Sequence, residues 1–440
     1  MSQNSNIDTY VAKLLSGQNL FITGAAGVGK SYTTNAIVAA FEAKGKNVVK
    51  LASTAMAATH IGGQTLHSFL ELRLYKSAIE LADTRHYRIP AKLKKILKQT
   101  DLIVIDEISM VSAGILDLVS LRLLQAHYRK AVLVVGDFLQ LSPVVRESDK
   151  RDYCQQFSIE NPNEIFGYAF ESQSWKEFAF ETVLLTTVYR TKDSDFMLLL
   201  DDVRRGIFGA PHANYLQAMY EKPIPDAMDF TFLFATNDEA LRHNQTMLAR
   251  IDTPEERLEA LYDADATPKA EIEKFCKESK IPTQFIVKVG ADILFTKNSR
   301  NFFNGERGRI RSIDHEKGIV RVEKEGGIIV RVERERFEKR GYELETVDGV
   351  ESRVERVYFG VMQFPFTLAY AITIHKAQGM GIEDLVIDTH RIFAPSQFYV
   401  ALSRAISPQR LILQGDPARL GRLVFVEKQA LAFYRALGMA

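Results

Sequence analysis

The sequence predicts an α/β protein with two parallel-sheet domains in tandem and a small antiparallel barrel inserted into the second. Two series of short apolar runs alternate with helix-patterned stretches, which is typical of parallel β-α-β units. Between about 298 and 363, Gly-separated β-branched runs have the spacing of antiparallel strands. A chain of 440 residues, 46% hydrophobic and 25% charged, is long enough for about three folded units, and this composition excludes disordered, collagen-like and coiled-coil proteins.

The first series lies at the N-terminus and predicts a domain of residues 1–184. Apolar runs at 19–24 (NLFITG) and 47–53 (NVVKLAS) flank a glycine-rich turn and a helical stretch that Gly45 closes. Runs typical of buried strands follow at 102–106 (LIVID) and 131–137 (AVLVVGD), with a helix-patterned segment between them.

The second series predicts another parallel sheet. Its apolar runs are 181–187 (ETVLLTT), 231–236 (TFLFAT), 384–388 (DLVID) and 410–415 (RLILQG). We assign residues 185–297 and 364–440 to this second domain and residues 298–363 to the inserted barrel, whose expected strands include 356–362 (RVYFGVM). The charged segment 252–282 is expected to form a helix-prone excursion on the surface.

Charge and cysteine content narrow the classes of function. The 56 Lys and Arg residues balance 55 Asp and Glu residues, so any contact with a polyanion must come from local patches. Cys154 and Cys276 lie far apart in the sequence, which disfavours a disulfide scaffold or a zinc site and fits a reducing compartment.

The sequence lacks signals for a membrane or for secretion. Its uninterrupted apolar segments are shorter than the roughly 18 residues that span a membrane. The first ten residues lack the pattern of a secretory signal. We therefore expect no membrane contact and a cytoplasmic location.

The segment GAAGVGKS, residues 24–31, follows a predicted strand and opens a predicted helix. It satisfies the pattern GxxxxGK[ST], in which backbone N–H groups and the helix dipole favour a triphosphate. Lys30 is expected to neutralise the terminal phosphates and the Ser31 hydroxyl to hold Mg²⁺. The predicted ATP-binding residues of this segment are Gly24, Ala25, Ala26, Gly27, Val28, Gly29, Lys30, Ser31 and Tyr32. A plain glycine turn is the alternative, which the strand-loop-helix context disfavours.

Acidic and amide side chains follow the next two predicted strands. Adjacent acids such as Asp106 and Glu107 are costly at the end of a buried strand unless they serve a cation and a water. We expect Asp106 to hold the magnesium ion and Glu107 to accept a proton from the attacking water. Asp137 and Gln140 end the following strand, where ligands of open α/β sheets bind, and Gln140 would read the γ-phosphate or orient the water. Taken alone, each motif has a plain alternative, a strand end or a polar loop without a role.

Together with LTTVYRT (185–191), AYAITIHKAQGMGIED (369–384) and FYVALSRA (398–405), these motifs resemble the PIF-type (petite integration frequency) helicases of superfamily one. Their order and spacing match over nearly the whole chain. The resemblance implies two RecA-like P-loop domains, with a small wedge at about 72–100 in the first and an SH3-like barrel in the second. It also implies a bacterial or phage member reduced to the helicase core.

The resemblance implies that the two domains sandwich ATP and Mg²⁺ between them. Arg190 and Arg404 of the second domain would offset charge on the transferring γ-phosphoryl group, and Gln378 and Gly379 would contact it. Without the resemblance, an arginine after a strand is more simply a surface residue. The predicted catalytic residues are Lys30, Asp106, Glu107, Gln140, Arg190 and Arg404.

Single-stranded DNA is expected on the opposite lip of the two domains, held through phosphate contacts and base stacking. By resemblance the contacts are Thr54, Thr65, His67, Ser68 and Phe69 in the first domain and Thr373, His375 and Lys376 in the second. Taken singly, each of these residues fits a packing role in the core as well as it fits a DNA contact. Weaker candidates are Phe302, Phe303 and Asn304, the alternating Arg307, Arg309 and Arg311, and a wedge tip at 85–90.

The resemblance implies a monomeric, ATP- and Mg²⁺-dependent helicase that moves 5′-to-3′ on single-stranded DNA and unwinds forked duplex. G-quadruplexes and RNA–DNA hybrids are further family substrates. A translocase that strips proteins from DNA and a RecD-like recombination motor remain alternatives; a nonenzymatic binding module is disfavoured because it needs no catalytic set. The sequence departs from the family at Ile7, where an adenine-reading glutamine is usual, at Ala55 and at Ser142. Adenine selectivity is therefore expected to be loose or supplied by the backbone.

Overall fold

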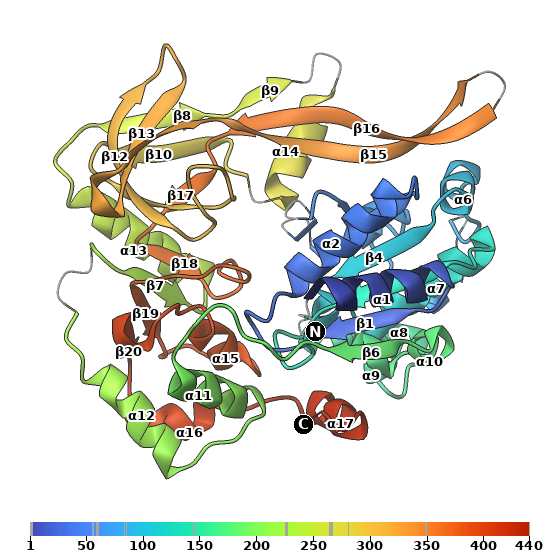
Figure 1. Ribbon diagram of the computed structural model, residues 1–440, viewed down its shortest axis with the longest axis horizontal. Coiled ribbons are helices and arrows are strands. Elements are labelled where there is room, and N and C mark those ends of the chain that lie inside the picture. The colour runs from blue at the N-terminus through green and yellow to red at the C-terminus, as the bar shows by residue number, and fades with distance from the viewer. Residues whose placement is uncertain are drawn as a thin grey trace.

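The computed structural model describes residues 3–54, 57–58, 61–82, 84, 86–143, 145, 147–224, 228–263, 267–279, 281–347 and 350–439. Two lobes built on parallel sheets lie side by side, and a long antiparallel hairpin extends from the second lobe across the first (Figure 1). None of the helices in these ranges has the length and apolarity needed to span a membrane.

The first lobe contains a six-stranded parallel sheet with the order β3-β2-β4-β5-β1-β6. Its strands are β1 (Leu20–Thr23), β2 (Val48–Ala52), β3 (Gln64–Thr65), β4 (Leu102–Asp106), β5 (Ala131–Val135) and β6 (Glu181–Leu184). Its helices are α1 (Gln3–Leu15), α2 (Lys30–Ala43), α4 (Leu66–Phe69), α5 (Ala78–Ala82), α6 (Ala91–Lys98), α7 (Ala113–Ala126), α8 (Glu147–Phe157), α9 (Asn163–Phe166) and α10 (Gln173–Phe178). Strands β1 and β5 are buried throughout and β4 is buried up to Ile105, as their continuous apolar runs predict.

One strand was assigned to the wrong sheet. The run 181–187, expected to open the second series, instead forms β6, which pairs with β1 in parallel from Leu20↔Glu181 to Thr23↔Leu184. The physical reason is the short connection: two residues separate the end of α10 from β6, so the strand stays beside the sheet on which α10 packs.

The second lobe contains a four-stranded parallel sheet with the order β18-β7-β19-β20. Its strands are β7 (Thr231–Phe234), β18 (Ala371–Thr373), β19 (Leu385–Asp388) and β20 (Leu411–Gln414). Its helices are α11 (Ser194–Arg204), α12 (Ala210–Tyr220), α13 (Asn237–Ala249), α15 (Gln397–Leu402) and α16 (Leu420–Leu423). The predicted tandem of two parallel-sheet domains is therefore confirmed.

The inserted segment is larger and more varied than the sequence suggests. A five-stranded antiparallel sheet has the order β14-β13-β12-β11-β17, and its closure as an SH3-like barrel stays a prediction. Its strands are β11 (Asp292–Phe295), β12 (Arg307–Asp314), β13 (Ile319–Lys324), β14 (Ile329–Glu333) and β17 (Phe366–Leu368). Residues 356–362, expected in the barrel, instead belong to the long hairpin of β15 (Glu335–Val347) and β16 (Val350–Gln363). The two strands pair over almost their whole length, so the chain has no break at which to turn back into the smaller sheet.

The charged segment 252–282 is only partly helical, contrary to expectation. It forms β8 (Glu255–Glu259), β9 (Leu261–Asp263) and α14 (Lys269–Glu278). Strand β8 pairs with β10 (Gln284–Lys288), and β9 adds to the edge of β16. Leu258 and Val287 are buried in one apolar cluster, so tertiary packing overrides the helical tendency of the charged sequence.

The segment 72–100, predicted to be a wedge, packs into the first lobe through Leu72, Leu81 and Leu97. Its central loop is held by Arg122 of α7, which donates to the carbonyl oxygens of Tyr87 at 2.8 Å and His86 at 2.9 Å. Arg85, at the start of the proposed tip, lies outside the described residues, as does Ala55. The hairpin reaches the same region (Figure 1), where Lys95 and Glu351 form an ion pair at 2.6 Å.

The last helix, α17 (Lys428–Ala436), belongs to the first lobe by its packing, although residues 364–440 were assigned to the second domain. Ala430 and Tyr434 are buried in the core of the first lobe. The ring of Phe433 stacks on Phe170, with 4.4 Å between centroids, and meets Phe138 edge-on at 5.4 Å. The chain thus crosses from the first lobe to the second and returns at its end.

Candidate nucleotide site

The phosphate loop between β1 and α2 has the backbone that its glycines require. Gly27 and Gly29 have φ values of 79° and 85°, in the left-handed region that favours glycine. A Cβ on Gly27 would lie 2.7 Å from the Cβ of Arg190, so the loop lies directly against the segment that leaves the first lobe. The N–H of Tyr189 donates to Gly27 O at 2.9 Å, which fixes this contact.

Lys30 begins α2, and its ammonium folds back over the loop. Its Nζ donates to the carbonyl oxygens of Gly24 at 2.8 Å and Ala25 at 2.9 Å. Burial lowers the pKa of Lys30, against the opposing charges of Asp137 and Glu107. A buried ammonium held only by carbonyl oxygens gains strongly from an anion, so the loop is prepared to exchange these oxygens for phosphate oxygens.

Asp106 and Glu107 lie at the end of β4, facing this loop. The N–H of Glu107 donates to Asp106 Oδ1 at 2.9 Å, and burial raises the pKa of Asp106. Burial, reinforced by the charge of Asp106, also raises the pKa of Glu107, to about 7. Gln378 of the second lobe donates from Nε2 to Glu107 Oε2 at 3.0 Å. A carboxyl group of this basicity can accept a proton, and a residue of the opposite lobe holds it.

Of the two arginines predicted from the second domain, Arg190 lies against Gly27 of the phosphate loop and Arg404 lies near Arg190 and Glu107. Arg190 donates from Nη1 to Ser403 O at 2.8 Å and from Nη2 to Gly379 O at 3.2 Å. Arg404 is buried and donates from Nε to Val400 O at 2.9 Å. Burial, reinforced by the charge of Arg190, lowers the pKa of Arg404 to about 9. Two neighbouring cations, the buried Arg404 and the half-buried Arg190, favour an anion between them.

Gln140 is hydrogen-bonded to the neighbouring Asp137, and its expected contact with the γ-phosphate or the water stays a prediction. Its Nε2 donates to Asp137 Oδ2 at 3.2 Å, and Asp137 forms a buried ion pair with Arg204 of α11. The sequence contains no pattern that marks Arg204, which looks like an ordinary basic residue at the end of a helix.

Tyr399 is a second site residue that the sequence analysis does not predict. Its hydroxyl accepts from the N–H of Ala26 in the phosphate loop at 2.9 Å. Tyr399 belongs to the family motif FYVALSRA (398–405), so the resemblance in this segment could have indicated a role for it.

The predicted adenine end of the site differs from the family pattern in a way that the structure explains. Ile7 packs against the apolar cluster of α1 that contains Val11 and Leu14. Ser31 and Tyr32 open α2 with exposed side chains, and Tyr32 is 59% exposed. The position of Ile7 thus serves the core.

The predicted DNA contacts of the first lobe gather around the short helix α4. Thr65 caps this helix by accepting from the N–H of Ser68 at 3.2 Å. Phe69 is buried and meets Tyr342 of the hairpin edge-on at 5.6 Å, so its ring serves packing in this arrangement. Burial lowers the pKa of His67, which favours its neutral form. Thr54 precedes this helix in the sequence and lies just after β2, where its Oγ1 accepts from the N–H of Ala57 at 3.2 Å.

In the second lobe, Thr373 ends β18 and is buried, and its Oγ1 accepts from the N–H of Lys376 at 3.4 Å. His375 lies between them in the same turn, directly before the segment with Gln378 and Gly379. The predicted DNA contacts of this lobe therefore adjoin its predicted nucleotide contacts along the chain.

The weaker candidates in the inserted sheet divide into buried and exposed residues. Phe302 stacks on Phe295 at 4.0 Å inside the sheet's core, while Phe303 is 66% exposed. Asn304 lies in the turn that follows them, and its N–H donates to Asn298 Oδ1 at 2.8 Å.

The three alternating arginines of β12 form ion pairs within the protein. Arg307 and Arg309 both bind Asp292, at 2.9 Å and 2.7 Å, and Arg311 pairs with Glu323. The side chains of Arg309 and Arg311 are 43% and 51% exposed, so their role as a DNA clamp stays a prediction.

Fold and site together define a two-domain P-loop ATPase whose nucleotide-binding residues come from both lobes.

Comparisons with known proteins identify the family. The family model for PIF1-like helicases matches residues 2–207. The ATP-dependent DNA helicase Pif1 of Campylobacter jejuni is 34% identical over 91% of this chain and 89% of its own, and that of Bdellovibrio bacteriovorus is 32% identical over 96% and 89%. The Candida albicans Pif1 helicase structure is similar with a TM-score of 0.70 and 27% identity over 99% of both chains. Pif1 from Bacteroides sp. in complex with ADP-AlF4 gives a TM-score of 0.83 at 24% identity, over 100% of this chain and 97% of that one. The chain belongs to the PIF1-like helicase family.

We expect Glu107→Gln to separate nucleotide binding from hydrolysis. The amide has nearly the same shape and keeps an oxygen for Gln378, but it cannot take a proton from water. Steady-state ATP hydrolysis should fall by at least about a hundredfold, with the affinity for a fluorescent ATP analogue little changed. Glu42→Gln, on an exposed position of α2, is the matched control and should hydrolyse ATP as the wild type does. Hydrolysis by Glu107→Gln at the control's rate would contradict the assigned role.

Proposed function

We propose that this protein is an ATP- and Mg²⁺-dependent DNA helicase that moves 5′-to-3′ along single-stranded DNA and opens the duplex ahead of it. The observation that carries the proposal is a nucleotide-binding site built from residues of both lobes. The base candidate Glu107 is bonded to Gln378 of the opposite lobe, and the phosphate loop touches the segment of Tyr189 and Arg190. A nucleotide bound there changes how the two lobes sit relative to each other, which is what a motor requires.

The contacts suggest how binding is coupled to hydrolysis. The γ-phosphate of ATP draws Lys30 away from the carbonyl oxygens that now hold it. The same phosphate gives Gln378 a stronger acceptor than Glu107 Oε2, so the base is released to the attacking water only when the lobes close on ATP. Arg190 and Arg404 exchange carbonyl partners for phosphate oxygens and offset the charge of the transferring group.

The proposed magnesium ligands fit a hard cation. The hydroxyl of Ser31 and the carboxylate of Asp106 are oxygen donors of the kind that Mg²⁺ prefers. Burial raises the pKa of Asp106, so a cation beside this carboxylate is favourable. When bound between Ser31 and Asp106, Mg²⁺ would neutralise part of the negative charge of the phosphates.

The proposed DNA path crosses both lobes, from α4 to the turn after β18. A strand held by both lobes moves when one lobe releases it before the other. Bacteroides Pif1 has been crystallised bound to single-stranded DNA, and another structure concerns unwinding of forked duplex by two coordinating Pif1 helicases. For this chain we propose that one monomer is enough to translocate.

Two tailed duplexes that differ only in the end carrying the overhang test activity and polarity together. We expect strand separation of the duplex with the 5′ tail, dependent on ATP and Mg²⁺, and none of the duplex with the 3′ tail. Omission of Mg²⁺ with excess chelator should abolish unwinding. Opening of the 3′-tailed duplex alone would refute the polarity. ATP-driven displacement of a protein block from single strands, without unwinding of either duplex, would instead establish the translocase alternative.

A further inference from the structure

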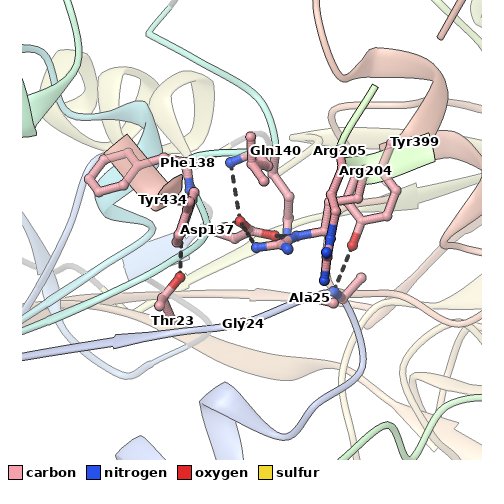
Figure 2. A network of polar contacts seen from close by, with 12 residues as sticks. Thr23, Gly24, Ala25, Asp137, Phe138, Gln140, Arg204, Arg205, Tyr399 and Tyr434 are labelled. Atoms are coloured by element: carbon pink, nitrogen blue, oxygen red, sulfur yellow. Dashed lines mark hydrogen bonds and ion pairs between the residues drawn. The ribbon is translucent and has the colours of Figure 1, made fainter. Parts of the chain in front are cut away.

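A buried polar cluster joins three distant parts of the chain beside the nucleotide site (Figure 2). Asp137 follows β5 of the first lobe, Arg204 ends α11 of the second lobe, and Tyr434 lies on the returning helix α17. All three side chains are buried. Helix α17 thus brings a hydroxyl group from the far end of the chain to the loop that carries Gln140.

Asp137 is the centre of this cluster, and its carboxylate accepts from five donors. Oδ1 accepts from Arg204 Nη2 at 2.8 Å, from the N–H of Leu139 at 3.1 Å and from the Tyr434 hydroxyl at 3.3 Å. Oδ2 accepts from Arg204 Nε at 2.9 Å and from Gln140 Nε2 at 3.2 Å. Although burial opposes it, the guanidinium of Arg204 holds the pKa of Asp137 below its ordinary value, so the carboxylate stays charged.

The hydroxyl of Tyr434 is bonded on three sides. It accepts from the N–H of Phe138 at 3.2 Å, contacts Thr23 Oγ1 at the end of β1, and donates to Asp137. Thr23 directly precedes the phosphate loop, and Phe138 lies two residues before Gln140. One hydroxyl group therefore ties together the two loops between which the γ-phosphate must lie.

A cavity adjoins the cluster beside Arg204. It has a volume of about 240 Å³, lies between the phosphate loop and α11 and is lined by Ala25, Met197, Arg204 and Tyr399, among others. The guanidinium of Arg204 lies over the ring of Tyr434, with 5.3 Å between its carbon and the ring centroid. At the edge of this cavity, Arg204 of the second lobe thus contacts both Asp137 of the first lobe and Tyr434 of α17.

We propose that Tyr434 is a positioning residue for ATP hydrolysis, which sets the loop of Asp137 and Gln140 relative to the phosphate loop and makes α17 a working part of the nucleotide site. The inference rests on the proposed ATPase function. Tyr434 touches no reacting atom; it acts through Asp137, whose carboxylate holds both the Gln140 amide and the arginine of the moving lobe. Misplacement of Gln140 should lower the rate of turnover and leave ATP affinity nearly intact, because Lys30 and the loop backbone are unchanged.

Tyr434→Phe tests the role of the hydroxyl group while keeping the ring. With saturating single-stranded DNA, we expect kcat for ATP to fall about tenfold and KM to stay within about twofold, since small misplacements of catalytic groups cost this much or more. Tyr128→Phe is the matched control, because it also removes a buried hydroxyl of the first lobe, one that donates to Ala131 O at 2.8 Å. It should leave kcat unchanged at a temperature where both variants are folded.

A double-mutant cycle with Gln140→Ala shows whether Tyr434 acts through this loop. In the Gln140→Ala background, Tyr434→Phe should have little further effect on kcat. The chain's one tryptophan, Trp175, lies 5.8 Å from Phe433 between centroids, so its fluorescence reports whether α17 remains docked. The emission of Tyr434→Phe should match the wild type, and that of Phe433→Ala should shift to the red.

Three results would overturn the inference. They are a kcat for Tyr434→Phe equal to that of the Tyr128→Phe control, an equal loss in the Gln140→Ala background, or a loss accompanied by red-shifted Trp175 emission. Absence of DNA-stimulated ATPase in the wild type is a separate outcome, which would overturn the proposed function and this inference with it.

Discussion

Lys30→Ala is expected to abolish DNA-stimulated ATP hydrolysis, with a loss of about a thousandfold or more, comparable to removal of a main donor to a developing anion. The reason is the position of this ammonium, which lies buried against the carbonyl oxygens of the loop and becomes the main positive charge on the terminal phosphates. Phosphate release at saturating single-stranded DNA measures the effect. Unwinding of the 5′-tailed duplex should disappear in parallel.

Lys44→Ala controls for loss of a lysine at the other end of the same helix, just beyond its last residue. Lys44 follows the C-terminal end of α2 and is exposed, so this variant should hydrolyse ATP at the wild-type rate. A Lys30→Ala variant that keeps DNA-stimulated hydrolysis would remove the basis for every enzymatic reading of this chain.

Arg404→Ala is expected to bind ATP but to hydrolyse it at least about a hundredfold more slowly, towards the roughly thousandfold effect of arginine fingers. Arg404 comes from the second lobe, yet its charge acts on Glu107 of the first. Nucleotide binding by the first lobe should survive, because the phosphate loop and Lys30 are intact. Titration with a fluorescent ATP analogue and single-turnover hydrolysis measure the two properties separately.

Arg404 is buried, so its removal needs two controls. Arg404→Lys keeps a positive charge but loses the planar donor fork, and its rate should lie between those of the wild type and the alanine variant. Arg422→Ala, at an exposed position of α16, should behave as the wild type. Normal turnover by a folded Arg404→Ala variant would refute a site shared between the two lobes.

The sequence predicts those parts of the site that depend on local order along the chain. The phosphate loop lies directly between β1 and α2, and Asp106 and Glu107 end a buried strand, so apolar runs followed by polar residues are sufficient to place them. The arginines and Gln378 come from resemblance, because their role depends on a second domain that faces the first.

The features that the sequence misses depend on contacts between distant residues. Asp137 contacts Arg204, which is 67 residues away in the sequence, and Tyr434, which is 297 residues away. The pattern of apolar residues along the chain does not indicate such pairs. The strand β6 was assigned to the wrong sheet for a related reason, since its apolar pattern fits either parallel sheet and the connection to α10 decides between them. The hairpin strands have the same alternation as the barrel strands, so their length and pairing are visible only in three dimensions.

The return of α17 to the first lobe has a consequence for the order in which this protein folds. Phe138, Phe170 and Trp175 form an aromatic cluster that Phe433 completes. During synthesis this N-terminal cluster must wait, with apolar surface uncovered, until residues 428–436 have left the ribosome. The first lobe is therefore complete only after the last helix has been synthesised, and until then these rings remain exposed to intermolecular contacts.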